Sequence, residues 1–198
     1  MTPSENPATS PPVRIILGVD PGTTVTGYGV IRCKGKYMEL INYGIIQLGK
    51  QQLAHPDKLK KIFDRVSSLV SEFEVKEMAL EAPFHGKNVQ SMLKLGRAQG
   101  VAMAAGLVYN LPIFEYAPKK VKMAVTGNGN ASKEQVARML ENLLEFTFEQ
   151  VPLDATDGLA VAVCHFFQGK ILSSGGGGKN WSSFLKDNPE RVRQRTHK

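Results

Sequence analysis

Hydrophobic and polar positions change their spacing along this chain, and each change predicts a different element. Three apolar runs rich in β-branched residues lie close together at 14–20, 26–33 and 36–48. Only short turns separate them, so we expect an antiparallel three-stranded meander. The next segment, 57–74, repeats its apolar residues every three or four positions. That repeat predicts an amphipathic helix.

Strands and helices alternate in the rest of the chain. Short apolar runs at 77–81 and 112–116 predict a fourth and a fifth strand. Pro118 suits the first turn of a helix, and Ser132 with Gln135 matches a capping box. The helices expected here span 88–108, about 118–125, about 132–144 and a last segment that starts at Asp154.

The order of elements predicts the fold class. A meander followed by strand–helix alternation indicates an α/β fold with a mixed five-stranded sheet flanked by helices, the RNase H-like layout. We expect this domain at 13–170, after a flexible Pro/Ser-rich arm at 1–12. The Gly-rich basic segment 171–198 lacks a hydrophobic period, so we expect a disordered C-terminal tail.

Composition excludes several classes of protein. At 198 residues the chain favours one main domain. Its two cysteines, Cys33 and Cys164, lie far apart and predict buried thiols rather than a disulfide framework or a zinc site. No apolar run reaches the roughly 18 residues of a membrane span, and the N-terminus does not resemble a signal peptide. We therefore expect a cytoplasmic protein without a membrane partner.

Charge is unevenly distributed along the chain. The formal net charge is +7, and the stretch 82–140 carries eight basic side chains against only Glu115 and Glu134. The following stretch, 141–157, holds five acids and no base. A basic surface beside concentrated acids suits an enzyme that grips phosphates and cuts one with metal ions. Solvated helix faces would give the same distribution, so charge alone leaves both interpretations open.

Four carboxylates occupy positions that phosphodiester hydrolysis could use. Two Mg²⁺ ions about 4 Å apart can activate water and neutralise the leaving oxygen, and Mg²⁺ prefers carboxylate oxygens. Asp20 and Glu81 each end an apolar strand. Asp154 and Asp157 are three positions apart at a helix start and share one face. All four are therefore candidates for metal binding and catalysis.

Each acid also has an ordinary structural explanation. Asp20 precedes a Pro-Gly pair, a common way to start a turn, and Glu81 could simply end its strand. Asp154 could cap its helix while Asp157 favours the helix dipole. Folding does not require an acid at all three places at once, so their conjunction favours the catalytic interpretation.

Five ordered motifs cover about three-quarters of the chain, from about Ile15 to Phe166. They are GVDPGTTVTGYGV (18–30), LEAPFHGKNVQSMLKLGRAQG (80–100), FEYAPKKVK (114–122), GNASKEQV (129–136) and DATDGLAVAVCH (154–165). In this series the chain closely resembles the RuvC family of Holliday-junction resolvases. The resemblance implies an endodeoxyribonuclease that makes paired symmetric nicks in four-way junction DNA with two Mg²⁺ ions per site, Mn²⁺ substituting. It also implies a homodimer that cooperates with the RuvA–RuvB branch-migration complex.

The resemblance also implies roles for single residues. The four carboxylates match the family's catalytic acids, and Lys122 and Lys133 match basic residues near the scissile phosphate. Phe84 matches an aromatic residue that touches the unstacked junction centre. Without the resemblance, Lys122 and Lys133 could be ordinary surface lysines, and Phe84 a loop anchor. The remaining basic side chains that we expect to contact DNA are Lys87, Lys94, Arg97, Lys119 and Lys120.

The small residues of 88–108 allow close packing, either on the chain's own sheet or across a dimer contact. A four-way junction has two equivalent scissile strands, which suits a twofold dimer.

Three other functions are compatible with the sequence. GVDPGTT also resembles the first phosphate loop of actin-like kinases and ATPases, but those enzymes close two such domains around a nucleotide. A non-catalytic binder of DNA structures would keep the basic surface without needing the acids. Another RNase H-like nuclease, acting on RNA, would share the acids and the fold. Junction, linear duplex and RNA hybrid substrates discriminate between these alternatives.

Overall fold

The computed structural model describes residues 12–49, 53–83, 88–148 and 152–174. Its five-stranded sheet has the order β3-β2-β1-β4-β5. The strands are β1 (Val13–Asp20), β2 (Val25–Lys34), β3 (Tyr37–Gln47), β4 (Glu77–Glu81) and β5 (Ile113–Tyr116). The helices are α1 (His55–Glu72), α2 (Val89–Leu107), α3 (Pro118–Thr126), α4 (Lys133–Leu144) and α5 (Leu153–Ser174). The predicted mixed sheet flanked by helices is confirmed.

The pairing of the strands explains why the sheet is mixed. β1, β2 and β3 form the expected antiparallel meander, because only short turns join them. β4 pairs with β1 and β5 pairs with β4, both in parallel, because a helix returns the chain before each. Since β1 and β4 are parallel neighbours, their carboxyl ends lie at the same edge of the sheet.

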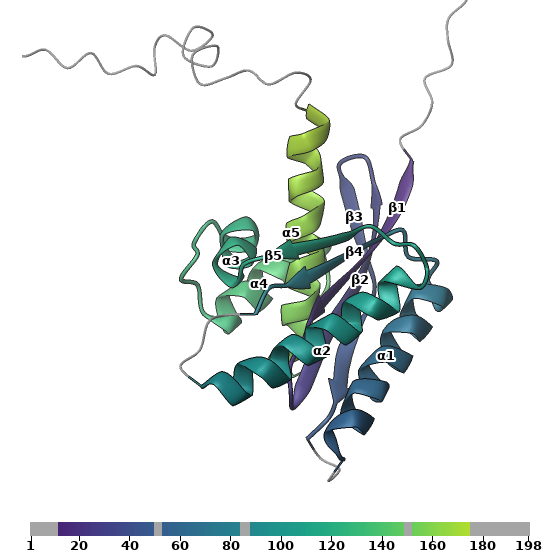
Figure 1. Ribbon diagram of the computed structural model, residues 1–198. Helices are drawn as coiled ribbons and strands as arrows, with labels where there is room; N and C mark the ends of the chain where they lie inside the picture. Colours follow the sequence, from purple (N-terminus) through teal and green to yellow (C-terminus); the bar gives the residue numbers. More distant parts are fainter. Residues whose placement is uncertain (1–11, 50–52, 84–87, 149–151, 175–198) are drawn as a thin grey trace, which may run out of the picture. The chain divides into compact units, whose positions relative to one another are not determined.

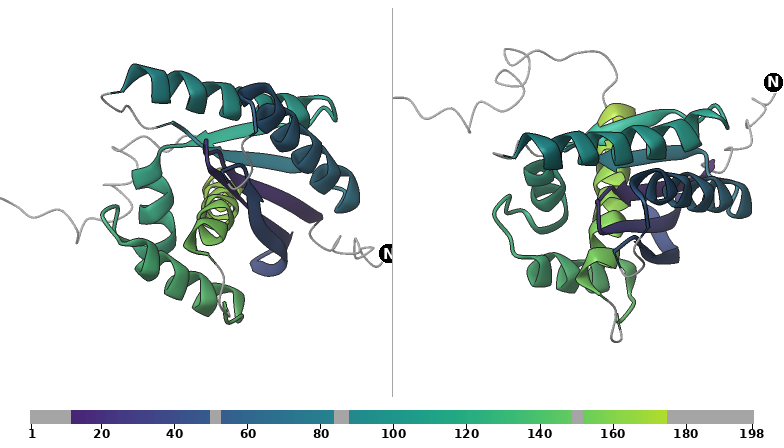
Figure 2. Two further views of the ribbon diagram at one scale, coloured as in Figure 1. Left: turned by 90° about the horizontal axis from the view of Figure 1, so that it is seen from below. Right: turned by 60° about the horizontal axis from the view of Figure 1, so that its bottom comes forward.

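Helices cover both faces of the sheet and create two hydrophobic cores. Along β1, Leu17 and Val19 face α1 and α2, whereas Ile16 faces α3, α4 and α5. In Figure 1, α1 and α2 lie side by side across one face and α5 runs along the other. Figure 2 shows the same two layers from other directions, with the sheet between them. Burial on both faces explains why β1 is continuously apolar until Asp20.

Glycines on β1, β2 and α5 allow the last helix to lie directly against the sheet. A Cβ atom on Gly27 would sit 2.0 Å from the Asp154 carbonyl oxygen, and one on Gly158 would sit 2.4 Å from Tyr28 Cα. No side chain fits at either position without moving the backbone. This close approach brings the first turns of α5 over the end of β1.

A buried hydrogen-bond chain ties the same helix to β4 and β5. The Tyr116 hydroxyl lies 2.6 Å from His165 Nδ1, and His165 Nε2 lies 2.8 Å from Glu77. Arg14 Nη1 donates to both carboxylate oxygens of Glu77, each at 3.2 Å. Burial lowers the pKa of His165 and so favours its neutral form, although the hydrogen bond to Glu77 opposes this shift. His165 therefore belongs to the core rather than to the carboxylate site.

Several local expectations can be compared with the structure. Ser132 and Gln135 form the predicted capping box at the start of α4. Cys33 and Cys164 are free and buried, as expected. None of the helices in the described part is long and apolar enough to cross a membrane.

The chain divides into two compact units, residues 1–167 and 168–198. Both hydrophobic cores and the four predicted carboxylates belong to the first unit. α5 continues to Ser174, beyond the predicted domain end at residue 170. Most of the predicted arm and tail lies outside the described residues.

Candidate active site

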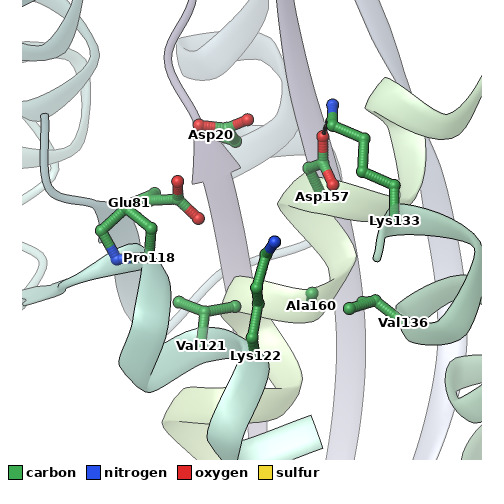
Figure 3. Close-up of a pocket in the computed structure, with 9 residues that line it drawn as sticks. All are labelled: Asp20, Glu81, Pro118, Val121, Lys122, Lys133, Val136, Asp157 and Ala160. Atoms are coloured by element: carbon green, nitrogen blue, oxygen red, sulfur yellow. Dashed lines mark hydrogen bonds and ion pairs between the residues drawn. The ribbon is translucent and has the colours of Figure 1, made fainter. Parts of the chain in front are cut away.

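Asp20 and Glu81 lie next to each other at one edge of the sheet. Val19 of β1 pairs with Leu80 of the parallel strand β4. The next residue of each strand, Asp20 and Glu81, therefore lies at the same edge of the sheet. Both carboxylates line a pocket of about 330 Å³ (Figure 3). Two acids that end separate apolar strands are therefore brought together by strand pairing.

The first turns of α5 supply two further carboxylates, but they are not equivalent. Asp157 lines the same pocket as Asp20 and Glu81, and its side chain is only 16% exposed. Asp154, one turn earlier, is 49% exposed and is not among the lining residues. Three of the four predicted acids thus share one pocket, with Asp154 at its margin.

Two lysines reach the pocket from the helices that face α5. Lys133, the first residue of α4, places its ammonium 2.9 Å from Asp154 Oδ1 and 2.5 Å from Asp157 Oδ2. Lys122, on α3, points into the pocket in Figure 3 and donates a 2.7 Å hydrogen bond to the Ala131 carbonyl oxygen. Both predicted lysines therefore stand beside the carboxylates.

Burial and mutual repulsion strongly perturb the acids. Burial, then repulsion from Asp157, raises the pKa of Asp20 from its ordinary 3.8 to about 7. Burial, then repulsion from Asp20, raises the pKa of Glu81 from 4.5 to about 8. Burial also raises the pKa of Asp157, although Lys133 opposes it. Burial lowers the pKa of Lys133, but its hydrogen bonds to Asp157 and Asp154 outweigh that effect and leave the pKa raised. Such crowding of like charge marks a functional site.

The donor set fits a hard divalent cation. Within the described ranges, no three acidic, histidine or cysteine side chains already converge as a metal cluster. The Asp154–Asp157 pair nevertheless holds a cation, the Lys133 ammonium. Carboxylate oxygens are the ligands that Mg²⁺ prefers, and positive charge would relieve the repulsion between Asp20 and Glu81.

The rest of the pocket was not predicted from the sequence. Apolar side chains of α3, α4 and α5 form its wall: Pro118, Val121, Val136 and Ala160. A smaller pocket of about 140 Å³ lies on the other side of Asp20 and Glu81 and includes Leu95 and Gln99 of α2. The one available signal was Gln99, a long polar residue within a run of small ones, which is buried and hydrogen-bonded to Glu115.

Among the described residues, the other predicted DNA contacts do not line the main pocket. Lys94 and Arg97 are exposed on α2, away from the residues that line the main pocket. Lys119 and Lys120 are exposed on α3, where the Lys120 ammonium lies 5.1 Å from the centre of the Tyr116 ring. Phe84 and Lys87 lie outside the described residues.

Sequence comparison places this chain in a known family. The family model "Crossover junction endodeoxyribonuclease RuvC" matches residues 16–165. A protein of that name from Cytophaga hutchinsonii is 59% identical over 183 residues, which cover 91% of this chain and 88% of that protein. A second, from Porphyromonas gingivalis, is 58% identical over 189 residues, 93% of this chain and 100% of that protein.

Comparison with solved structures identifies the same family. RuvC of T. thermophilus, in complex with a Holliday junction substrate, superposes with a TM-score of 0.74 and 28% identity. The match covers 81% of this chain and 97% of that one. The residues that the family model matches, 16–165, include every carboxylate and lysine that lines the pocket. The chain belongs to the RuvC family of crossover junction endodeoxyribonucleases, a family of metal-dependent enzymes.

Proposed function

We propose that this chain resolves Holliday junctions by symmetric nicks in two strands, using Asp20, Glu81, Asp154 and Asp157 to hold divalent metal. One observation carries the proposal: three of these acids and two lysines, drawn from five elements, line one pocket. The complex of T. thermophilus RuvC with its junction supports the same class of substrate.

The carboxylates would hold Mg²⁺, two ions per site, with Mn²⁺ as a substitute. When bound, divalent ions lower the pKa of water and act as Lewis acids toward phosphate oxygens. Asp20 lies between Glu81 on the neighbouring strand and Asp157 on α5, and is therefore the acid placed to serve both groups of ligands. Asp154, at the margin, completes the set from the more exposed side.

The two lysines would act on the substrate phosphate. Negative charge accumulates on the phosphate oxygens during an in-line displacement, and fixed cations stabilise it. Lys122 is held by the Ala131 carbonyl and points into the pocket, so its charge is placed before substrate arrives. The apolar wall made by Val121, Val136 and Ala160 lowers the local dielectric constant on that side, which strengthens these interactions.

DNA would extend from the pocket over basic side chains of two helices. Lys119 and Lys120 are exposed on α3, the helix that carries Lys122. Lys94 and Arg97 are exposed on α2. Phe84 and Lys87 stay candidates for contacts at the junction centre. The domain would then be the DNA-processing part at 13–170, with the arm and the basic tail as accessory segments in the cytoplasm.

We also propose a homodimer, because two sites are needed for two strands. α2 offers a surface for it. Ala98, Ala102 and Ala105 face the chain's own core, whereas Gly96 and Gly100 have open space where a Cβ atom would point. Exposed Val89 and Leu93 lie on the same helix. Analytical ultracentrifugation of Gly96→Arg against the wild type tests this surface.

The RuvA–RuvB complex remains the partner that the family suggests.

The decisive experiment compares substrates. Purified protein is incubated with a synthetic four-way junction, a linear duplex of matched sequence and an RNA–DNA hybrid, each with and without Mg²⁺. We expect paired, ligatable nicks in the junction only, and only with Mg²⁺. Equal cutting of linear DNA or of the hybrid would indicate another nuclease of this fold. Junction binding without any cutting would indicate a non-catalytic binder.

A further inference from the structure

A second polar pocket lies behind the turn that joins α3 to α4. It has a volume of about 350 Å³, within the range of small-ligand sites, and is lined from Thr126 and Asn128 across to the outer face of α4. Gln135, Arg138 and Asn142 contribute from that face, with spacings of three and four residues that align them along the helix. Among the described residues that line it, none is acidic.

One residue joins this pocket to the active site. Ala131 lines the second pocket, and its carbonyl oxygen accepts the hydrogen bond from Lys122, which lines the first. Thr126, at the end of α3, lines the second pocket and donates to the Lys122 carbonyl oxygen. Two residues of the polar pocket are thus hydrogen-bonded to Lys122, which lines the catalytic pocket.

The polar groups of the second pocket are largely unused by the fold. Asn128 and Gln135 each accept a backbone hydrogen bond through the side-chain oxygen, from Asn130 and Ser132, but their amide nitrogens bond to no other described residue. Asn142 makes no side-chain hydrogen bond within the described ranges. Arg138 is in none of the salt bridges among the described residues, and its charge acts on Glu134, one turn earlier, only at longer range. The pocket therefore presents several donors and acceptors to a ligand.

We propose that this pocket binds one nucleobase that flanks the scissile phosphate and so contributes to the choice of cleavage sequence. The inference rests on the proposed junction-cleaving function. A strand whose phosphate lies at Lys122 would pass Ala131, whose carbonyl oxygen accepts from that lysine, to bring a neighbouring base to the pocket. The partly exposed Met139 provides an apolar surface for the flat face of a base, and the amides and guanidinium meet its polar edge.

Base recognition explains the composition of the pocket better than phosphate binding does. A phosphate site needs clustered cations, and Arg138 is the one charged side chain among the lining residues. Three amides, by contrast, match the mixed donor and acceptor patterns of base edges, where Asn, Gln and Arg make paired hydrogen bonds. The amides therefore favour a base over its phosphate.

The test is a panel of four-way junctions that differ only in the nucleotide at each position flanking the mapped cleavage site. For the wild type we expect a preference at one or more positions. Arg138→Ala and Asn142→Ala should reduce the preference at one of them by at least about fivefold, with little change on the poorest sequence. Arg138→Lys should behave like Arg138→Ala, because lysine keeps the charge but not the paired geometry.

Two controls make the result interpretable. Arg32→Ala removes an exposed arginine from the distant β2–β3 hairpin and should leave the preference unchanged. In a metal-free complex, 2-aminopurine at the affected position should change its fluorescence with the wild type but not with Arg138→Ala. Thermal unfolding should show that all variants are folded.

Other outcomes would overturn the inference. A uniform loss on every sequence, restored by Arg138→Lys and accompanied by weaker salt dependence, would identify a phosphate contact. An unchanged preference in Arg138→Ala and Asn142→Ala, or a wild type that cuts all sequences equally, would remove the base-reading role and leave junction resolution intact. A wild type that cuts no junction at all would overturn the proposed function itself.

Discussion

The Lys133 ammonium lies 2.5 Å from Asp157 Oδ2 although the two residues belong to different helices and stand 24 positions apart. A second carboxylate, Asp154, holds the same ammonium at 2.9 Å. A cation at this place thus competes with Lys133 for its ligands. Movement of the lysine from the carboxylates toward the substrate phosphate would couple metal binding to substrate binding.

Lys133→Ala should separate metal affinity from catalysis. Removal of the competing cation should tighten Mn²⁺ or Mg²⁺ binding, measured by isothermal titration calorimetry. The cleavage rate should fall by about 10²-fold, because one fixed charge is lost from the phosphate site. Lys60→Ala, which removes an exposed lysine from α1, is the control and should change neither quantity. Unchanged metal affinity would contradict the competition.

Asp20→Asn should abolish cleavage and spare the fold. The side chain keeps its size but loses the charge that a metal ion needs, so the rate on a four-way junction should fall by at least about 10³-fold. Junction binding, measured by gel shift without Mg²⁺, should stay within a few-fold of the wild type. Retained cutting by Asp20→Asn would refute the assignment of this residue.

The metal-free protein should become less stable as the pH rises. The pKa values of Asp20 and Glu81 are raised to about 7 and 8, so the folded state holds these protons more tightly than the unfolded state. This contribution to stability is complete below pH 4 and is lost as the pH passes through 7 and 8. In EDTA, Tm should therefore be lower at pH 9 than at pH 6.

The same experiment has two internal controls. Mg²⁺ should raise Tm more at pH 9 than at pH 6, because at lower pH the ion must displace protons from the acids. Asp20→Asn should show a flatter dependence of Tm on pH, since one titrating group is gone. A Tm that rises with pH through this range in EDTA would contradict the raised pKa values of these two carboxyl groups.

Gly158→Ala should damage both stability and activity. Its Cβ atom would lie 2.4 Å from Tyr28 Cα, so α5 must move away from the sheet. We expect a loss of about 3 kcal/mol in the free energy of unfolding, the upper range for overpacking, and slower cleavage because Asp154 and Asp157 move with the helix. Urea denaturation measures the first effect and junction cleavage the second.

Gly100→Ala is the matched control for that variant. It lies within α2, where nothing is within 4 Å of the added Cβ atom. Alanine is the better helix former, so the free energy of unfolding of the monomer should stay the same or rise by up to about 1 kcal/mol, whatever the variant does to the proposed dimer surface. Equal losses in the two variants would mean that α5 does not depend on this close contact.

Local patterns in the sequence determined most of the elements and the two most unusual acids. The apolar period of β1 and β4 identifies both strands, and Asp20 and Glu81 stand out because each interrupts a buried run. The capping box of Ser132 and Gln135 marks the start of α4. These features depend on residues that are close in sequence, which is why periodicity reveals them.

Only the tertiary structure decided how the acids differ and what surrounds them. The sequence places Asp154 and Asp157 on one helical face, but the packing of α5 at Gly158 puts Asp157 inside the pocket and leaves Asp154 at its margin. Likewise, Lys133 meets these acids only because α4 and α5 converge. Such distances are set by contacts between segments far apart in the chain, and no local pattern encodes them.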